Sequence, residues 1–280
     1  MSDILASLNA LAALPGVPEQ VTAAREACER LRWHEALRRR IPEAAAESRV
    51  RGAQASAALE GATVPLGLVR DVMRGAAAWP VHPDPVEQVA RGAVQATAES
   101  ERVAGAVLGA PLQALARLHV ASAAGLVDDD QLGRPRLGHE QSDELMDLGP
   151  APSASELMER LAHLVSALTA GVGVPGLVVA AVAHAEVMTA RPFVRGNGVV
   201  ARALERAVVQ ATGLDPTGVA VTEAGHATQG GPAYLGALAA YGTGTSQGVA
   251  LWIGHCASAL VAAAQQGEQV CDAVRAGRLT

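Results

Sequence analysis

The segment TARPFVRGNGVVARAL, residues 189–204, has the composition of an anion-binding loop that leads into a helix. Glycines on both sides of Asn197 permit a tight turn and a close approach of the backbone to a ligand. The free amides at the start of the following helix would attract an anion. Arg202, early in that helix, opposes the helix dipole unless an anion lies nearby. No residue of the segment accepts a proton at neutral pH, so the segment predicts binding, with a plain turn between helices as the alternative.

The elements that must position this loop are predicted to be helices. Half of the 280 residues are apolar, mostly Ala, Val and Leu, and only 2% are aromatic. Small side chains favour helices whose axes approach closely. Prolines near helix starts and glycines after helix ends delimit the segments. We expect an all-α fold in a single helical domain, with helices over 17–41, 42–61, 64–75, 83–109, 111–125, 153–171, 175–189 and 199–213, followed by two more.

The polar stretch 128–153 interrupts this helical pattern. Gly and Pro break it throughout, which predicts a long loop, or a short β-hairpin flap at most. A loop of this length in a compact domain usually carries a function or is disordered. We therefore expect residues 128–153 to carry a function or to be disordered, with contact to a protein target or partner as the candidate function.

The segment RPFVRGNGVVAR, residues 191–202, resembles the Fic family signature H-P-F-x-[D/E]-G-N-G-R-x-x-R. The matching positions are Pro192, Phe193, Gly196, Asn197, Gly198 and Arg202. Upstream, LARLHVASAAGLVDDDQLGRPR resembles the family's Leu-His helix and the loop after it, which ends at Gly133 and Arg136. His184 stands at the position of a structural histidine. The resemblance covers roughly residues 40–270 and implies the Fic fold, with residues 1–40 as an N-terminal helical extension and 41–280 as the Fic-like domain.

A second segment, SAALEG, resembles the family's inhibitory motif [S/T]-x-x-x-E-[G/N]. Ser56 and Glu60 lie four residues apart, so they share one face of a helix that we place at about 44–60. Glu60 precedes Gly61 at the helix end, where the dipole disfavours an anion, so its carboxylate needs a cation. The resemblance implies that Glu60 pairs with Arg202 and obstructs the γ-phosphate of a nucleotide. The alternative is an ordinary exposed glutamate before a capping glycine.

Three positions depart from the Fic signature in ways that change the implied chemistry. Family members typically transfer AMP from ATP to a hydroxyl group of a target protein, using a histidine base and an acidic residue that holds Mg²⁺. Arg191 replaces the base, and a guanidinium stays protonated. Arg195 replaces the metal ligand and should repel Mg²⁺. Val199 replaces one phosphate-binding arginine. His184, in the core, and His139 and His226, expected in loops, are poor substitutes as a base.

Three functions remain open. The first is a degenerate Fic protein without standard AMP transfer that keeps a cationic pocket for phosphate or nucleotide. Its candidate residues are Arg191, Arg195, Gly196, Asn197, Gly198 and Arg202. The second is a non-standard transferase that moves AMP or another phosphate-containing group. The third is a partner-binding module without a ligand. No cofactor is certain, and ATP or another phosphate-bearing molecule, bound without Mg²⁺, is the candidate ligand.

Charge and composition restrict the partners. The net charge of −6 argues against a nucleic-acid-binding surface. Cys28, Cys256 and Cys271 form no metal-ligand or disulfide pattern, so we expect a cytoplasmic protein. The apolar run 174–188 is too short to span a bilayer and contains His184 and Glu186, which favours a buried helix and no membrane association. The sequence leaves open whether the chain forms a homo-oligomer.

Overall fold

A computed structural model describes residues 2–144 and 149–278 of the chain. The described part contains twelve α-helices and two short 3-10 segments, and no β-strand beyond a single bridge between Ala124 and Val127. The all-α prediction is therefore confirmed, with a long loop rather than a hairpin over the described part of residues 128–153. Residues 145–148 of that loop lie outside the described residues. The helices are α1 Ser2–Ala12, α2 Val17–Arg32, α3 Ile41–Leu59, α4 Leu66–Met73, α5 Pro85–Ala104, α6 Pro111–Ala123, α7 Ala154–Ala170, α8 Gly176–Ala190, α9 Asn197–Ala211, α10 Thr222–Gln229, α11 Gly231–Gly242 and α12 Ser246–Arg275.

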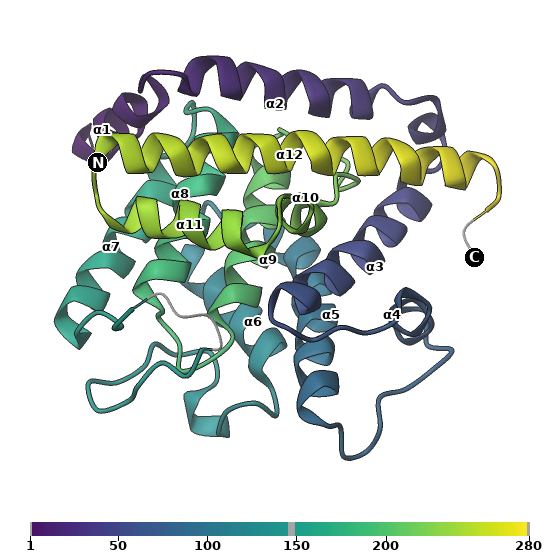
Figure 1. Cartoon of the computed structure of the whole chain (residues 1–280), viewed down its shortest axis with the longest axis horizontal. Helices are drawn as coiled ribbons and strands as arrows, with labels where there is room; N and C mark the ends of the chain where they lie inside the picture. The colour runs from purple at the N-terminus through teal and green to yellow at the C-terminus, as the bar shows by residue number, and fades with distance from the viewer. Residues whose placement is uncertain (1, 145–148, 279–280) are drawn as a thin grey trace.

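The apolar helix α8 and its neighbour α9 form the centre of the bundle. Nearly every residue of both helices is buried, which fulfils the expectation that the apolar run is a core helix. Helices α2 and α12 lie side by side along one edge, while α3, α5 and α6 approach α9 from the other side (Figure 1). The polar loop that follows α6 lies at the end of the bundle opposite α2 and α12 (Figure 1). The start of α9 lies at this loop end.

Helix α12 is long and apolar enough, by length and composition, to cross a membrane, but 61% of its apolar window is buried within the protein. Its packing against α2 and α10 is typical of the core helix of a globular domain.

Close helix crossings depend on residues without side chains. A Cβ added at Gly92 of α5 would lie 2.1 Å from the carbonyl oxygen of Ser122 in α6. A Cβ at Gly225 of α10 would lie 2.0 Å from the carbonyl oxygen of Ala259 in α12. Neither crossing tolerates even alanine without a backbone shift, as expected for closely packed interiors.

Two helix predictions were wrong in detail. The predicted helix over 17–41 breaks after Arg32, where His34 accepts a hydrogen bond from the Ala36 amide at 3.2 Å and begins a 3-10 turn, Glu35–Arg38. The sequence also missed α10, which carries His226 into the core. His226 therefore does not lie in a loop.

Candidate functional site

The motif turn places the start of α9 beside a small cavity, which Gly196 and Val199 help to line. Gly196 adopts a left-handed conformation with φ of 87°. A Cβ there would lie 3.2 Å from Ser122 Oγ. The buried side chain of Asn197 fixes the turn, because Oδ1 accepts from the Phe193 amide and Nδ2 donates to the Phe193 carbonyl, both at 2.9 Å. The glycine and asparagine of the motif therefore act mainly on backbone geometry.

His119 of α6 supports the turn from the opposite side. Its ring stacks on Phe193 with centroids 3.8 Å apart and planes 6° apart. Its Nδ1 accepts from the Gly133 amide at 2.9 Å, so the proton lies on Nε2, which donates to the Arg195 carbonyl at 3.2 Å. Burial lowers the pKa of His119 to about 4, against the weaker effect of the Arg195 hydrogen bond, so the ring is neutral at pH 7.

Helix α3 ends at the inhibitory segment with a glycine-dependent cap. Gly61 has φ of 80°, its amide donates to the Ala58 carbonyl, and the Ala62 amide donates to the Ala57 carbonyl. These two bonds form a Schellman motif, which confirms Gly61 as the capping glycine and fixes the direction of Glu60.

Glu60 contacts Arg202, as the resemblance implied. Oε1 accepts from Arg202 Nη2 at 2.7 Å, and the residues are 7% and 0% exposed. Ser56 completes the contact, because its Oγ accepts from Nε at 3.0 Å and its carbonyl accepts from Nη2 at 3.1 Å. Tyr234 also bonds the guanidinium of Arg202. The buried guanidinium is therefore neutralised by one carboxylate and held by Ser56 and Tyr234.

The two added arginines point in different directions. Arg191 is the only non-glycine residue of the described chain with positive φ, at 46°. Its guanidinium donates to the carbonyls of Gly149 and Pro150 at 2.7 and 2.6 Å, and its own carbonyl accepts from Arg136 Nε at 2.9 Å. These bonds stabilise a backbone conformation that costs a non-glycine residue about 1–2 kcal/mol. Arg191 thus anchors the polar loop.

Arg195, in contrast, lines the cavity at the start of α9, together with Val199 and Glu60. Its Nη1 lies 3.7 Å from the exposed carboxylate of Asp143. The loop backbone is joined to the motif here, because the Asp143 amide donates to the Val194 carbonyl at 2.6 Å. The cavity has a volume of only about 20 Å³, room for about one water molecule.

Glu144 fills the space that an anion would take, and no sequence pattern indicated this role. Its Oε1 accepts from the Asn197 backbone amide at 2.8 Å and from Asn197 Nδ2 at 2.6 Å. Burial, and then the charge of Glu60, raise the pKa of Glu144 to about 7, despite the bonds from Asn197. The amides of the turn thus already bind a carboxyl group of the same chain.

A second polar cluster lies deeper, around Glu205 of α9. Its Oε2 accepts from His184 Nδ1 at 2.5 Å and from His226 Nε2 at 2.7 Å. The other ring nitrogens bond Tyr234 Oη at 2.7 Å and His255 Nε2 at 3.1 Å. Burial opposes ionisation of Glu205, but the two histidines hold its pKa well below its usual range. Three ligand-type groups meet here, with ligand atoms within 4.8 Å of one another, and in the structure they bond one another directly.

None of the three alternative histidines is positioned as a base: His184 is fully buried and bonds Glu205. His226 is fully buried in the Glu205 cluster, and His139 is exposed on the polar loop.

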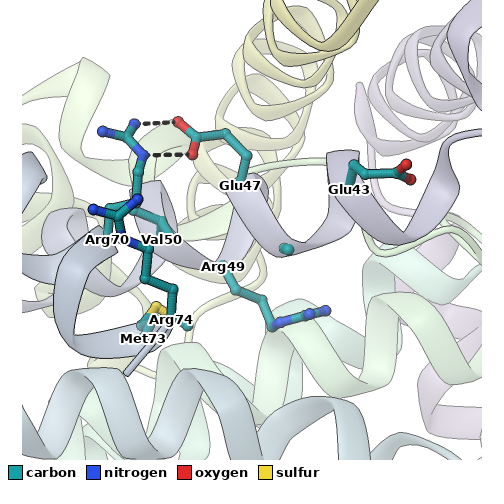
Figure 2. A pocket seen from close by; sticks show the side chains of 8 residues that line it. Glu43, Glu47, Arg49, Val50, Arg70, Met73 and Arg74 are labelled. Atoms are coloured by element: carbon teal, nitrogen blue, oxygen red, sulfur yellow. Dashed lines mark hydrogen bonds and ion pairs between the residues drawn. The ribbon is translucent and has the colours of Figure 1, made fainter. Parts of the chain in front are cut away.

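A larger surface groove, of about 420 Å³, lies between α3 and α4 (Figure 2). Three arginines line it, and each is paired with a carboxylate: Arg49 with Glu101, Arg70 with Glu47 and Arg74 with Asp71. This groove offers no unpaired cation for an anion.

Comparisons with known proteins support the fold. No family model and no curated protein matches the sequence. The structure is similar to a Fic family protein from Desulfovibrio desulfuricans G20, with a TM-score of 0.67, 24% identity, and coverage of 95% of this chain and 76% of that one. It is also similar to Fic-1 from C. elegans, with a TM-score of 0.64, 18% identity, and coverage of 93% and 73%. A Fic domain containing signaling protein from Bacteroides thetaiotaomicron VPI-5482 gives a TM-score of 0.60, 15% identity, and coverage of 90% and 98%. The resemblance in sequence is thus confirmed at the level of the fold.

Proposed function

We propose that this chain, which has the fold of Fic family proteins, is catalytically silent and binds a phosphate-bearing molecule without Mg²⁺ at the start of α9. The observation that carries the proposal is the anion position itself. The Asn197 amide and side chain donate to a carboxyl oxygen of Glu144, which supports the proposal that the same donors bind an external anion. Backbone amides at a helix start are also the usual partners of phosphate oxygens.

Arg202 supports a phosphate ligand beyond the first contact. It is fully buried and paired with a single carboxylate, that of Glu60. A ligand oxygen that replaced Glu60 would keep the charge of Arg202 neutralised through a charge-assisted bond. Nucleotide di- and triphosphates place several oxyanions along one chain, which would let one bond the Asn197 amide while another replaces Glu60 at Arg202.

Catalysis lacks its two principal groups. Arg191 cannot accept a proton, and its guanidinium is bonded to the carbonyls of residues 149 and 150. Arg195 brings positive charge to the position where the Fic signature has an acidic residue, which disfavours a divalent cation. Loss of a general base alone costs about 10²–10⁴ in rate. Binding without transfer is therefore the function that the geometry supports best.

Calorimetry with ATP, ADP and pyrophosphate, each with and without Mg²⁺, tests the ligand. We expect binding that Mg²⁺ does not strengthen, and tighter binding to Glu60→Gly because the internal competitor for Arg202 is gone. Arg202→Met is the matched control and should bind more weakly than the wild type. Absence of heat for all three ligands in both the wild type and Glu60→Gly refutes the proposal.

A repair experiment tests catalytic silence. The combined variant Arg191→His, Arg195→Asp, Val199→Arg and Glu60→Gly restores the signature that this chain lacks. We expect AMP transfer from labelled ATP, to itself or to proteins of a cell lysate, in the repaired protein and none in the wild type. Transfer by the wild type that is lost in Arg202→Met would instead favour a non-standard transferase.

A further inference from the structure

We propose that Glu144 is a built-in competitor for the anion site, so that occupation of the start of α9 by an external anion depends on pH. The inference rests on the proposed function, because it describes how that same site is regulated. In the structure the carboxyl group of Glu144 takes the position of the ligand, and it must leave before an external anion binds.

The source of the carboxyl group argues for a competitor rather than an ordinary helix cap. A helix start is usually capped by the side chain of its own N-cap residue. The N-cap of α9 is Gly196, which has no side chain. The acceptor comes instead from the polar loop, 53 residues earlier in the chain. A cap that is not part of the helix can be exchanged for another anion without unwinding the helix.

The cavity leaves no room for two anions. Glu144, Glu60 and Arg195 line a space of about 20 Å³. A sulfate or phosphate group is several times larger than this space, which holds about one water molecule. An external oxyanion that bonds the Asn197 amide therefore excludes the Glu144 carboxyl group from it.

The charged groups around Glu144 set the direction of the pH effect. Glu60 faces it from the end of α3, and Arg195 faces it from the motif loop. The neighbouring parts of α5 and α6 contribute Val89 and Ser122, which do not titrate. In the occupied state the pKa of the Glu144 carboxyl group is about 7, compared with 4.5 for a free glutamate. Because the occupied state binds the proton more tightly, low pH favours occupation and rising pH favours release.

The size of the effect follows from these two values. With a pKa of about 7 in the site and 4.5 outside it, the ratio of occupied to vacated protein falls about tenfold between pH 6 and pH 8. Glu144→Gln keeps an oxygen that accepts from Asn197 and cannot ionise, so it should stay in the site at both pH values. Glu144→Ala should leave the site open at both.

The first test needs no ligand. The Asn197 amide resonance of the full-length ¹⁵N-labelled protein is followed from pH 5.5 to pH 8.5. We expect a titration with a midpoint near 7 that is present in the wild type and in the matched control Asp143→Asn, and absent in Glu144→Gln. A flat Asn197 resonance in the wild type, or the same titration in Glu144→Gln, overturns the proposal.

The second test uses sulfate, which keeps both charges throughout this range. We expect the affinity of the wild type to rise about tenfold between pH 6 and pH 8. Glu144→Ala should bind at pH 6 as tightly as at pH 8, and Glu144→Gln should bind weakly at both. Equal binding of the wild type and Glu144→Ala at pH 6 refutes the competition alone. Absence of sulfate binding in every variant, with the Asn197 titration intact, refutes the proposed anion site and with it the competition.

Discussion

Removal of the Glu60 carboxylate should destabilise the protein strongly, because it leaves the Arg202 guanidinium charged and unpaired in the core. The two side chains are 6% and 0% exposed, and their closest N–O distance is 2.7 Å. Loss of one partner of such a buried pair typically costs about 3–5 kcal/mol. With about 2.1 cal/mol/K of unfolding entropy per residue, a chain of 280 residues should lose about 5–9 °C in Tm on Glu60→Ala.

Urea unfolding followed by circular dichroism, together with thermal melts, measures this cost. The matched control is Glu29→Ala, which breaks a surface pair with Arg25 whose side chains are 58% and 62% exposed. We expect a change below about 0.5 kcal/mol for the control. The double variant Glu60→Ala/Arg202→Met should recover most of the loss, because it removes both charges. A cost below about 1 kcal/mol for Glu60→Ala, or no recovery in the double variant, would show that the pair is not desolvated as described.

Two further predictions concern the polar loop and the buried histidines. Arg191→Ala should raise the rate of amide hydrogen exchange in the described residues next to 149 and 150, because the guanidinium donates to both carbonyls. The helices of the bundle should stay protected. An unchanged exchange rate next to 149 and 150 would contradict the anchoring role. Burial lowers the pKa of His119, His184 and His255 to about 4 each, so the unfolded chain binds more protons between pH 6.5 and pH 4. The free energy of unfolding should therefore fall with decreasing pH, by about 1 kcal/mol per histidine per pH unit, which the raised pKa of Glu144 offsets only in part. Urea titrations at pH 7, 6 and 5 check this slope, and a flat profile would contradict it.

Most helices could be predicted because their limits are local. A proline in the first turn and a glycine after the last turn predicted helix α3 and its cap at Gly61. The apolar run predicted the buried helix α8. Helix α10 was missed because TEAGHATQ is short and contains glycine and threonines, which disfavour helix. Its helical state depends on burial against α12, where Gly225 allows close contact with Ala259.

The part of the site that the sequence predicted is the part formed by two motifs, the SAALEG segment and the segment that ends at Arg202. The spacing of Ser56 and Glu60 and the position of Arg202 predicted a contact that is present at 2.7 Å. The sequence could not indicate that Arg191 turns toward the polar loop, because its acceptors are backbone carbonyls of residues 149 and 150. Glu144 was missed because its partner Asn197 lies 53 residues further along the chain. Nothing in the sequence distinguishes Glu144 from the other acidic residues of the loop.

The crossing of α5 and α6 at Gly92 affects the cavity at the start of α9, although Gly92 does not line that cavity. A methyl group at position 92 would collide with the Ser122 carbonyl oxygen, so the backbone of α5 or α6 would have to shift. Ser122 also borders the cavity and lies against the turn at Gly196. The position of Ser122 at the cavity thus depends on Gly92, a residue that does not line the cavity. A mutational screen confined to the cavity wall would overlook this position.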